Sequence, residues 1–162
     1  MSAPFVDLYK HNLWANLKLL DVCSPLSDEQ LEAGAAGTYG TVKNTLVHMV
    51  AAERRYVAML RGEQPDRTIH ESLGFPGIDA LRESAQQSGQ ALIQIAEREQ
   101  TGRILSGEWR GEPFTINISI PLIQAINHAT EHRAHIMTVL SQNSVEVPEL
   151  DGWSFEDALK EG

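Results

Sequence analysis

The sequence has few cysteines and no long apolar run, and each shortage excludes a class of protein. Cys23 is the single cysteine among 162 residues, so the chain cannot form an internal disulfide and is not a disulfide-stabilised secreted scaffold. Residues 1–20 include Asp7 and Lys10 and hold neither a secretory signal nor an apolar run long enough to cross a bilayer. We therefore expect a cytoplasmic protein that does not act in a membrane.

Basic residues are also scarce, which argues against nucleic acid as a partner. Lys and Arg number 13 against 22 Asp and Glu, and the formal net charge is −9. Only Arg54 and Arg55 stand together, and one such pair is not a basic patch that follows a phosphate backbone. The sequence also lacks the G-x-S-x-G, Walker, Rossmann and C-x-x-C patterns, which argues against the enzyme classes that depend on them.

The sequence does contain four long stretches with helical apolar spacing. A chain of this length fits one domain, here residues 1–162. Thr41 is the expected N-cap of the second helix and Gly62 its end. Four such helices predict an all-α fold, an antiparallel four-helix bundle. The expected helices cover residues 4–23, 42–61, 78–99 and from 120 or 121 to 142.

Between and after these helices the sequence predicts shorter elements. Residues 62–76 hold two glycines and two prolines and form a long loop. Before the last long helix, apolar and polar residues alternate, which predicts a small β-hairpin made of residues 103–109 and 113–118. After the last long helix, in the tail that holds Trp153 and Phe155, we expect one more short turn packed on the bundle.

Three histidines lie on one face of the last long helix. His128 and His132 are about 40° apart on the helical wheel, and His135 lies about 20° to the other side of His128. A histidine pair at i and i+4 places two ring nitrogens where one metal ion can take both; the alternative is a solvated or hydrogen-bonded face. A third ligand has to come from another helix. His48 is the candidate, although a histidine among apolar residues can equally be a core residue.

The chain resembles the DinB-like family of metalloenzymes over nearly its whole length. Four segments carry the resemblance: residues 8–16 (LYKHNLWAN), residues 41–53, the His-x-x-x-His-Arg motif that ends at Arg133, and residues 150–153 (LDGW). The resemblance implies a four-helix bundle with long connections at its middle helices, a homodimer and a bound divalent metal. It implies that the metal ligands are His48, His128 and His132.

One position departs from the pattern of that family. The family usually shows Gly-Gln after His-Arg, whereas this chain has Ala134 and His135. His135 can be a fourth ligand, a group that hydrogen-bonds a ligand, a titratable group that faces the pocket, or a replaced glutamine without a further role. A fourth ligand would fill the open position that catalysis needs.

The expected chemistry follows from the metal and from the resemblance. Three neutral imidazoles suit Zn, Ni, Fe or Cu, and our first expectation is Zn or Ni, with an open position for a small-molecule substrate. The resemblance implies a transferase that uses a low-molecular-weight thiol, of the bacillithiol or mycothiol type, on electrophilic small molecules. One alternative is a metal-dependent hydrolase with Glu131 or His135 as the general base. Another is a metal- or ligand-binding stress protein without catalysis.

Two features of the predicted helices concern packing. The helix over residues 42–61 carries apolar residues on both sides, which we interpret as a homodimer contact; cover by the long loops is the alternative.

Glu53 lies on the apolar stripe of that helix, and Arg133 lies on the apolar side of the last long helix. Because a buried charge is costly unless it is paired, we predict a direct ion pair between them. The alternative is that both side chains reach solvent.

Overall fold

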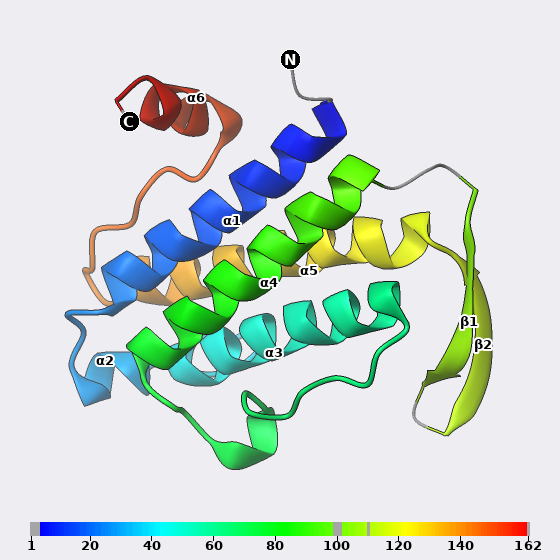
Figure 1. Ribbon diagram of the computed structural model, residues 1–162. Helices are drawn as coiled ribbons and strands as arrows, with labels where there is room; N and C mark the ends of the chain where they lie inside the picture. The colour runs from blue at the N-terminus through cyan, green and yellow to red at the C-terminus, as the bar shows by residue number, and fades with distance from the viewer. Residues whose placement is uncertain (1–3, 99–101, 110, 162) are drawn as a thin grey trace.

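Four long helices form the body of the protein in the computed structural model, which describes residues 4–98, 102–109 and 111–161. Helices α1 (Pro4–Cys23) and α3 (Val42–Arg61) each pack against both α4 (Ile78–Arg98) and α5 (Ser119–Gln142). Helix α1 runs antiparallel to α4, and α3 runs antiparallel to α5 (Figure 1). The expected four-helix bundle is confirmed.

The ends of these helices follow from local chemistry. The hydroxyl of Thr41 accepts a hydrogen bond from the backbone N–H of Asn44 at 3.3 Å and caps the start of α3. Gly62 follows α3 with φ 70°, in the left-handed region that glycine adopts without steric cost. Helix α5 begins at Ser119, slightly earlier than expected, and the expected last residue of α4, residue 99, lies outside the described residues.

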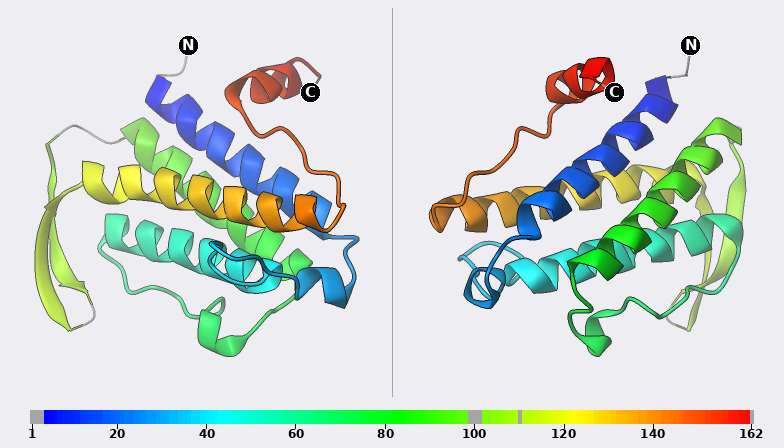
Figure 2. Two further views of the ribbon diagram at one scale, coloured as in Figure 1. Left: turned by 180° about the vertical axis from the view of Figure 1, so that it is seen from behind. Right: turned by 60° about the vertical axis from the view of Figure 1, so that its left-hand side comes forward.

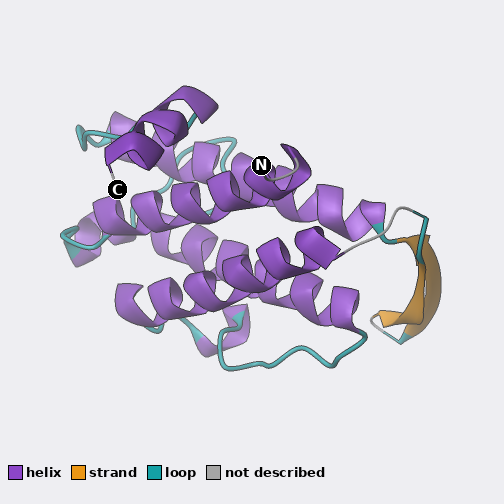
Figure 3. Ribbon diagram, turned by 45° about the horizontal axis from the view of Figure 1, so that its top comes forward, coloured by secondary structure: helices purple, strands orange, loops and turns teal. Residues whose placement is uncertain are grey.

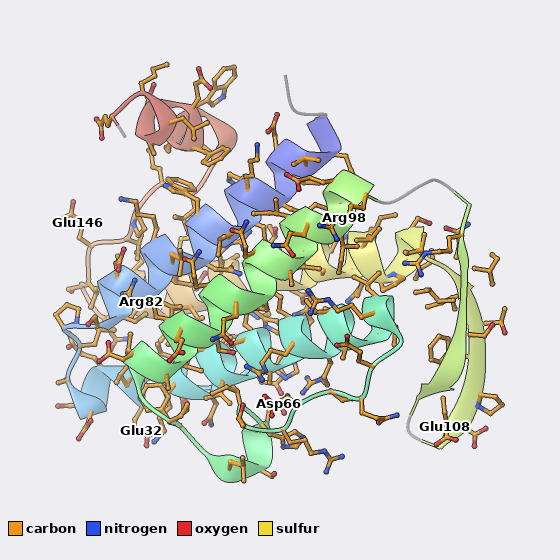
Figure 4. The ribbon with its side chains drawn as sticks, in the orientation of Figure 1. Glu32, Asp66, Arg82, Arg98, Glu108 and Glu146 are labelled. Atoms are coloured by element: carbon orange, nitrogen blue, oxygen red, sulfur yellow. The ribbon has the colours of Figure 1, made fainter. Side chains whose placement is uncertain are left out.

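The connection between α3 and α4, residues 62–77, has to bring the chain back to the end of the bundle where α3 began. It therefore runs back along α3 (Figure 1), and we call it the strap. A short turn, η1 (Glu71–Leu73), interrupts it. Two neighbouring residues of α3 hold the strap: Arg54 pairs with Asp66, which Figure 4 labels, and Arg55 pairs with Glu71.

A two-stranded hairpin lies beyond one end of the bundle (Figure 3). Strand β1 (Ile104–Trp109) pairs antiparallel with β2 (Glu112–Asn117), so the predicted hairpin is confirmed. The second strand ends one residue before the expected position. Ile118 turns into the core instead, where 2% of its surface is exposed, and it immediately precedes α5.

The remaining short helices are α2 (Asp28–Leu31), which opens with a capping box, and α6 (Gly152–Glu161). Helix α6 packs on α1 through Phe155, whose ring centroid lies 5.5 Å from that of Trp14. Trp153, by contrast, is 82% exposed. The expected short turn is thus a helix of 10 residues that packs on the bundle through Phe155. Among the described residues, no helix combines the length and the apolar character that crossing a bilayer requires.

The interior consists of two apolar clusters with a polar layer between them. One cluster gathers around Leu20, Leu46 and Leu140, and the other around Tyr9, Leu92 and Leu122. Each long helix contributes at least one buried polar residue to this layer, and the members of the layer hydrogen-bond to one another. These polar residues are Asn12 and Asn16 of α1, Glu53 of α3, Ser88 of α4 and Arg133 of α5.

The predicted ion pair between Glu53 and Arg133 is wrong in its geometry. Both residues are buried, with 4% and 3% of their surface exposed, so neither reaches solvent. No hydrogen bond or ion pair joins them directly, although both lie in the described part of the chain; instead, Arg133 donates to Asn12 and Asn16, which donate to Glu53. The amide side chains lie where we expected direct contact.

Both sides of α3 are already covered within one chain. Ala51 and Ala52, on the side opposite Leu46, are 1% and 3% exposed, and the strap runs along α3 (Figure 1). Cover by the chain itself was the alternative explanation for the two apolar sides of this helix. The burial of α3 therefore gives no argument for a second chain, and the homodimer stays a prediction.

Candidate metal centre

Three imidazole rings from two helices converge on one point. Helix α3 supplies His48, and α5 supplies His128 and His132; Figure 2 shows these helices side by side. The Nε2 atom of His128 lies 3.0 Å from Nε2 of His48 and 3.2 Å from Nε2 of His132. All three candidate ligand atoms lie within 4.8 Å of one another. The structure thus brings together the three histidines at which the resemblance implies a metal.

The spacing of these nitrogens suits a metal ion. A tetrahedral ion with metal–nitrogen bonds of about 2.0–2.1 Å sets its ligand nitrogens about 3.3 Å apart, close to the two Nε2 separations given above. Burial first, and then the neighbouring charges, among them His48, lower the pKa of His128 and of His132 to about 4. Both rings are therefore neutral near pH 7, with a lone pair available for a metal.

Two loop residues surround His48. The ring of Tyr39 stacks on the ring of His48, with centroids 4.1 Å apart and planes 18° apart. It also makes a T-shaped contact with the ring of His132, with centroids 5.0 Å apart. On the strap, Glu71 places Oε1 2.8 Å from Nδ1 of His48. Sequence reasoning missed both residues, because they belong to loops and follow no helical spacing that would mark them.

Glu71 is itself held by an arginine fork. Arg55 Nη1 and Nη2 donate to its two carboxylate oxygens at 3.1 and 2.9 Å. Partial burial alone would raise the pKa of Glu71, but the hydrogen bonds from Arg55 and His48 outweigh burial and lower this pKa to about 2. Glu71 is therefore a carboxylate near pH 7.

A cavity adjoins the centre on the side of these loops. Its volume is about 310 Å³, and its wall includes Tyr39, Asn44, Val47 and Glu71. Tyr39 is 49% exposed, so this side of the centre is open to solvent rather than sealed. The space is of a size for a small molecule.

The two residues proposed as general bases lie outside the group of three. Glu131 is exposed on α5; its charge raises the pKa of His132, but no hydrogen bond between the described residues links it to the three rings. The ring centroid of His135 lies 5.5 Å from that of His132. Nδ1 of His135 is buried without a hydrogen-bond partner in the described structure. His135 is not a fourth member of the group.

The other two histidines have local roles. His70 caps η1, since its Nδ1 accepts a hydrogen bond from the backbone N–H of Ser72 at 3.1 Å. His11 lies 2.8 Å, through Nε2, from the backbone oxygen of Leu150 and so ties α1 to the tail. Neither ring joins the group of three.

Comparisons with known proteins agree with this fold. The model of the DinB family matches residues 1–161. Among solved structures, the chain is similar to a DinB-like protein from Bacillus cereus ATCC 10987, with a TM-score of 0.67 and 20% identity over 90% of this chain and 94% of that one. At that identity the likeness shows the fold alone. No curated protein matches the chain. Because the family model spans almost all of the sequence, the chain belongs to the DinB family.

Proposed function

We propose that the protein holds a divalent metal ion, Zn or Ni, through His48, His128 and His132 and transfers a low-molecular-weight thiol, of the bacillithiol or mycothiol type, to an electrophilic small molecule. One observation carries this proposal: three Nε2 atoms converge, with no fourth protein ligand among the described residues of the group. Three neutral nitrogen ligands and a free position are the arrangement of catalytic rather than structural metal sites.

In this reaction the metal would activate the thiol, and residues of the chain would bind the electrophile. A metal bound here would lower the pKa of a coordinated thiol and so supply a thiolate near neutral pH. In the transfer, the thiol would lose its proton to solvent, its sulfur would form a bond to a carbon of the electrophile, and the leaving group would depart from that carbon with the electron pair of the bond that breaks. Tyr39 and Asn44 line the open side of the centre, where the electrophile would bind.

The single cysteine cannot supply this sulfur. Cys23 has none of its surface exposed, and burial raises the pKa of its thiol to about 12. A thiol chemistry at the three histidines therefore needs a thiol from outside the chain. A cytoplasmic location fits such a cofactor, because that compartment keeps small thiols reduced.

The test compares protein loaded with Zn or with Ni against the His128→Ala variant. Each is incubated with a thiol, bacillithiol or mycothiol, and a generic electrophile such as 1-chloro-2,4-dinitrobenzene, and the thioether is measured by mass spectrometry. We expect metal-dependent conjugation by the wild type and a loss of at least 100-fold in the variant. Equal rates in the two proteins, above the uncatalysed rate, would show that the histidines do not carry the reaction.

The same samples separate the alternative functions. Hydrolysis of ester substrates by the loaded protein, without thiol dependence, would favour the hydrolase. In that case Glu131 or His135 would have to act as the general base. Tight metal binding without turnover of either kind would favour a metal-binding stress protein.

We also propose that the protein is a homodimer. Large apolar side chains are exposed on three helices and are available for such a contact: Phe5 and Leu8 of α1, Ile120 and Ile123 of α5, and Trp153 of α6. Light scattering at micromolar concentration should give the mass of two chains, and the mass of one chain would contradict the dimer.

A further inference from the structure

We propose that Glu71 is the positioning residue of the metal centre: its carboxylate fixes the hydrogen of His48 on Nδ1 and so turns the lone pair of Nε2 toward the metal. This inference rests on the proposed function, because it gives a role to a residue outside the group of three histidines. Because Glu71 lies on the strap between α3 and α4, this loop would take part in orienting a metal ligand.

The geometry at His48 favours one tautomer of its imidazole ring. A neutral imidazole carries a single hydrogen, on one of its two nitrogens. Oε1 of Glu71 lies 2.8 Å from Nδ1, and a carboxylate can only accept a hydrogen bond. The hydrogen is therefore on Nδ1. Nε2, which lies 3.0 Å from Nε2 of His128, keeps its lone pair free for the metal.

Tyr39 is the competing partner of the same nitrogen, because its hydroxyl lies 3.0 Å from Nδ1 of His48. The rings of Tyr39 and His48 are nearly parallel, 18° apart, and the phenol oxygen lies in the plane of its own ring. The hydroxyl is thus above the imidazole plane, whereas an N–H bond points along that plane. Glu71, and not Tyr39, is the acceptor that can hold this hydrogen.

The rigidity of Glu71 comes from α3 itself. Arg55 follows His48 by seven residues, two helical turns, so both side chains leave the same face of α3. Arg55 holds both carboxylate oxygens of Glu71, and Glu71 in turn contacts His48. The strap thus returns along α3 and joins two residues of that helix. Carboxylates that orient metal-binding histidines in this way strengthen metal affinity about 10- to 100-fold.

The experiment measures Zn²⁺ affinity by competition with a chromogenic chelator for the wild type and three variants. Glu71→Ala removes the acceptor, and Tyr39→Phe removes only the hydroxyl. Asp66→Ala is the matched control, because Asp66 lies on the same strap but binds Arg54 and Thr68 rather than the metal centre. We expect about 10- to 100-fold weaker binding for Glu71→Ala. We expect the other two variants to stay within about threefold of the wild type.

A second readout does not depend on metal. Long-range ¹H–¹⁵N spectra of the metal-free protein report which nitrogen of His48 carries hydrogen. We expect the Nδ1–H form in the wild type and in Asp66→Ala, and a mixture of both forms in Glu71→Ala. The Glu71→Gln variant serves as a conservative check, because its amide oxygen can still accept the hydrogen bond and should preserve most of the Nδ1–H form.

The outcomes separate this inference from the proposed function. Tight Zn²⁺ binding by the wild type that Glu71→Ala retains would overturn the role of Glu71 and leave the metal centre standing. An equal loss in Glu71→Ala and Asp66→Ala would also overturn it, since a loosened strap alone would then account for the effect. A wild type that does not bind Zn²⁺ or Ni²⁺ would overturn both the proposed function and this inference.

Discussion

Glu53 of α3 and Arg133 of α5 are joined through two side-chain amides rather than by direct contact. Oδ1 of Asn12 and of Asn16 accept from Arg133 Nη1 at 2.7 and 2.6 Å, and both Nδ2 groups donate to Glu53 Oε2 at 3.1 Å. An asparagine amide suits this place because it carries an acceptor for the cation and a donor for the anion. Ser88 completes the layer by donating to Oε1 of Glu53 at 2.5 Å.

This bridge gives a first prediction, on stability. Arg133→Met should lower the free energy of unfolding by about 3 kcal/mol, because it leaves Glu53 buried without a compensating charge. Burial already raises the pKa of Glu53, so the variant should unfold more readily as the pH rises and the carboxyl group ionises. Urea unfolding at several pH values measures both effects.

A second substitution serves as the control for this prediction. In the double variant Arg133→Met, Glu53→Leu, neither charge is left alone, and part of the lost stability should return. A single Arg133→Met variant that loses less than about 1 kcal/mol would show that the polar layer contributes little to the fold.

The second prediction concerns metal and stability. A ligand present at 100 times its dissociation constant stabilises a protein by about 2.7 kcal/mol, which for a chain of this size is a rise of roughly 5–10 °C in Tm. Zn²⁺ should raise the Tm of the wild type by this amount, and EDTA should reverse the effect. His128→Ala should not respond.

His135→Ala is the matched control for metal binding. His135 lies on the same helix as His128 but is not a member of the group of three. Its variant should keep the Zn²⁺ response in calorimetry. Loss of the response in His135→Ala would instead make this ring a ligand.

The third prediction concerns pH in the metal-free protein. The pKa of His128 and of His132 is lowered to about 4, whereas both groups titrate near pH 6.5 in the unfolded chain. Between these values the unfolded chain binds more protons than the folded one, so stability present above pH 6.5 is lost as the pH falls toward 4. We expect a change on the order of 1 kcal/mol, reduced by solvent at the partly exposed His128.

Chemical denaturation in EDTA at pH 7, 6, 5 and 4 checks this dependence. Other groups also titrate in this range, so the informative quantity is the difference between the wild type and a His128→Gln, His132→Gln double variant. The double variant should lose less stability over the same range. Parallel curves for the two proteins would contradict the lowered pKa values.

The fourth prediction concerns the contact between α1 and α4. A Cβ atom added at Gly89 would lie 2.6 Å from Cδ1 and 3.1 Å from Cβ of Leu13. Gly89→Ala should therefore destabilise by about 1–2 kcal/mol, since overpacking outweighs the gain in helix propensity. Gln90→Ala, at an exposed neighbour on α4, should change stability by less than about 0.5 kcal/mol. A stabilising Gly89→Ala variant would mean that Leu13 moves aside freely.

The elements of the fold can be predicted from the amino-acid sequence because the signals for them are local. The bounds of α1 and α3 agree with those expected from apolar spacing, the Thr41 cap and Gly62, and the hairpin follows from a change of period. The pairing of His128 with His132 is equally local, since a helix fixes the distance between residues i and i+4. These features require no knowledge of what packs against them.

Contacts between residues far apart in the sequence depend on how the helices and loops pack, and local signals do not predict them. His48 lies 80 residues before His128 and reaches it because α3 packs against α5. The sequence shows two charged residues on apolar helix faces, one acidic and one basic. It does not show the amides that connect them, because Asn12 and Asn16 come from a third helix. The contact between Glu71 and His48 depends on the path of the strap, and a loop has no periodicity that predicts which helix face it will cover. Local chemistry thus specified the helices, and packing assembled the centre between them.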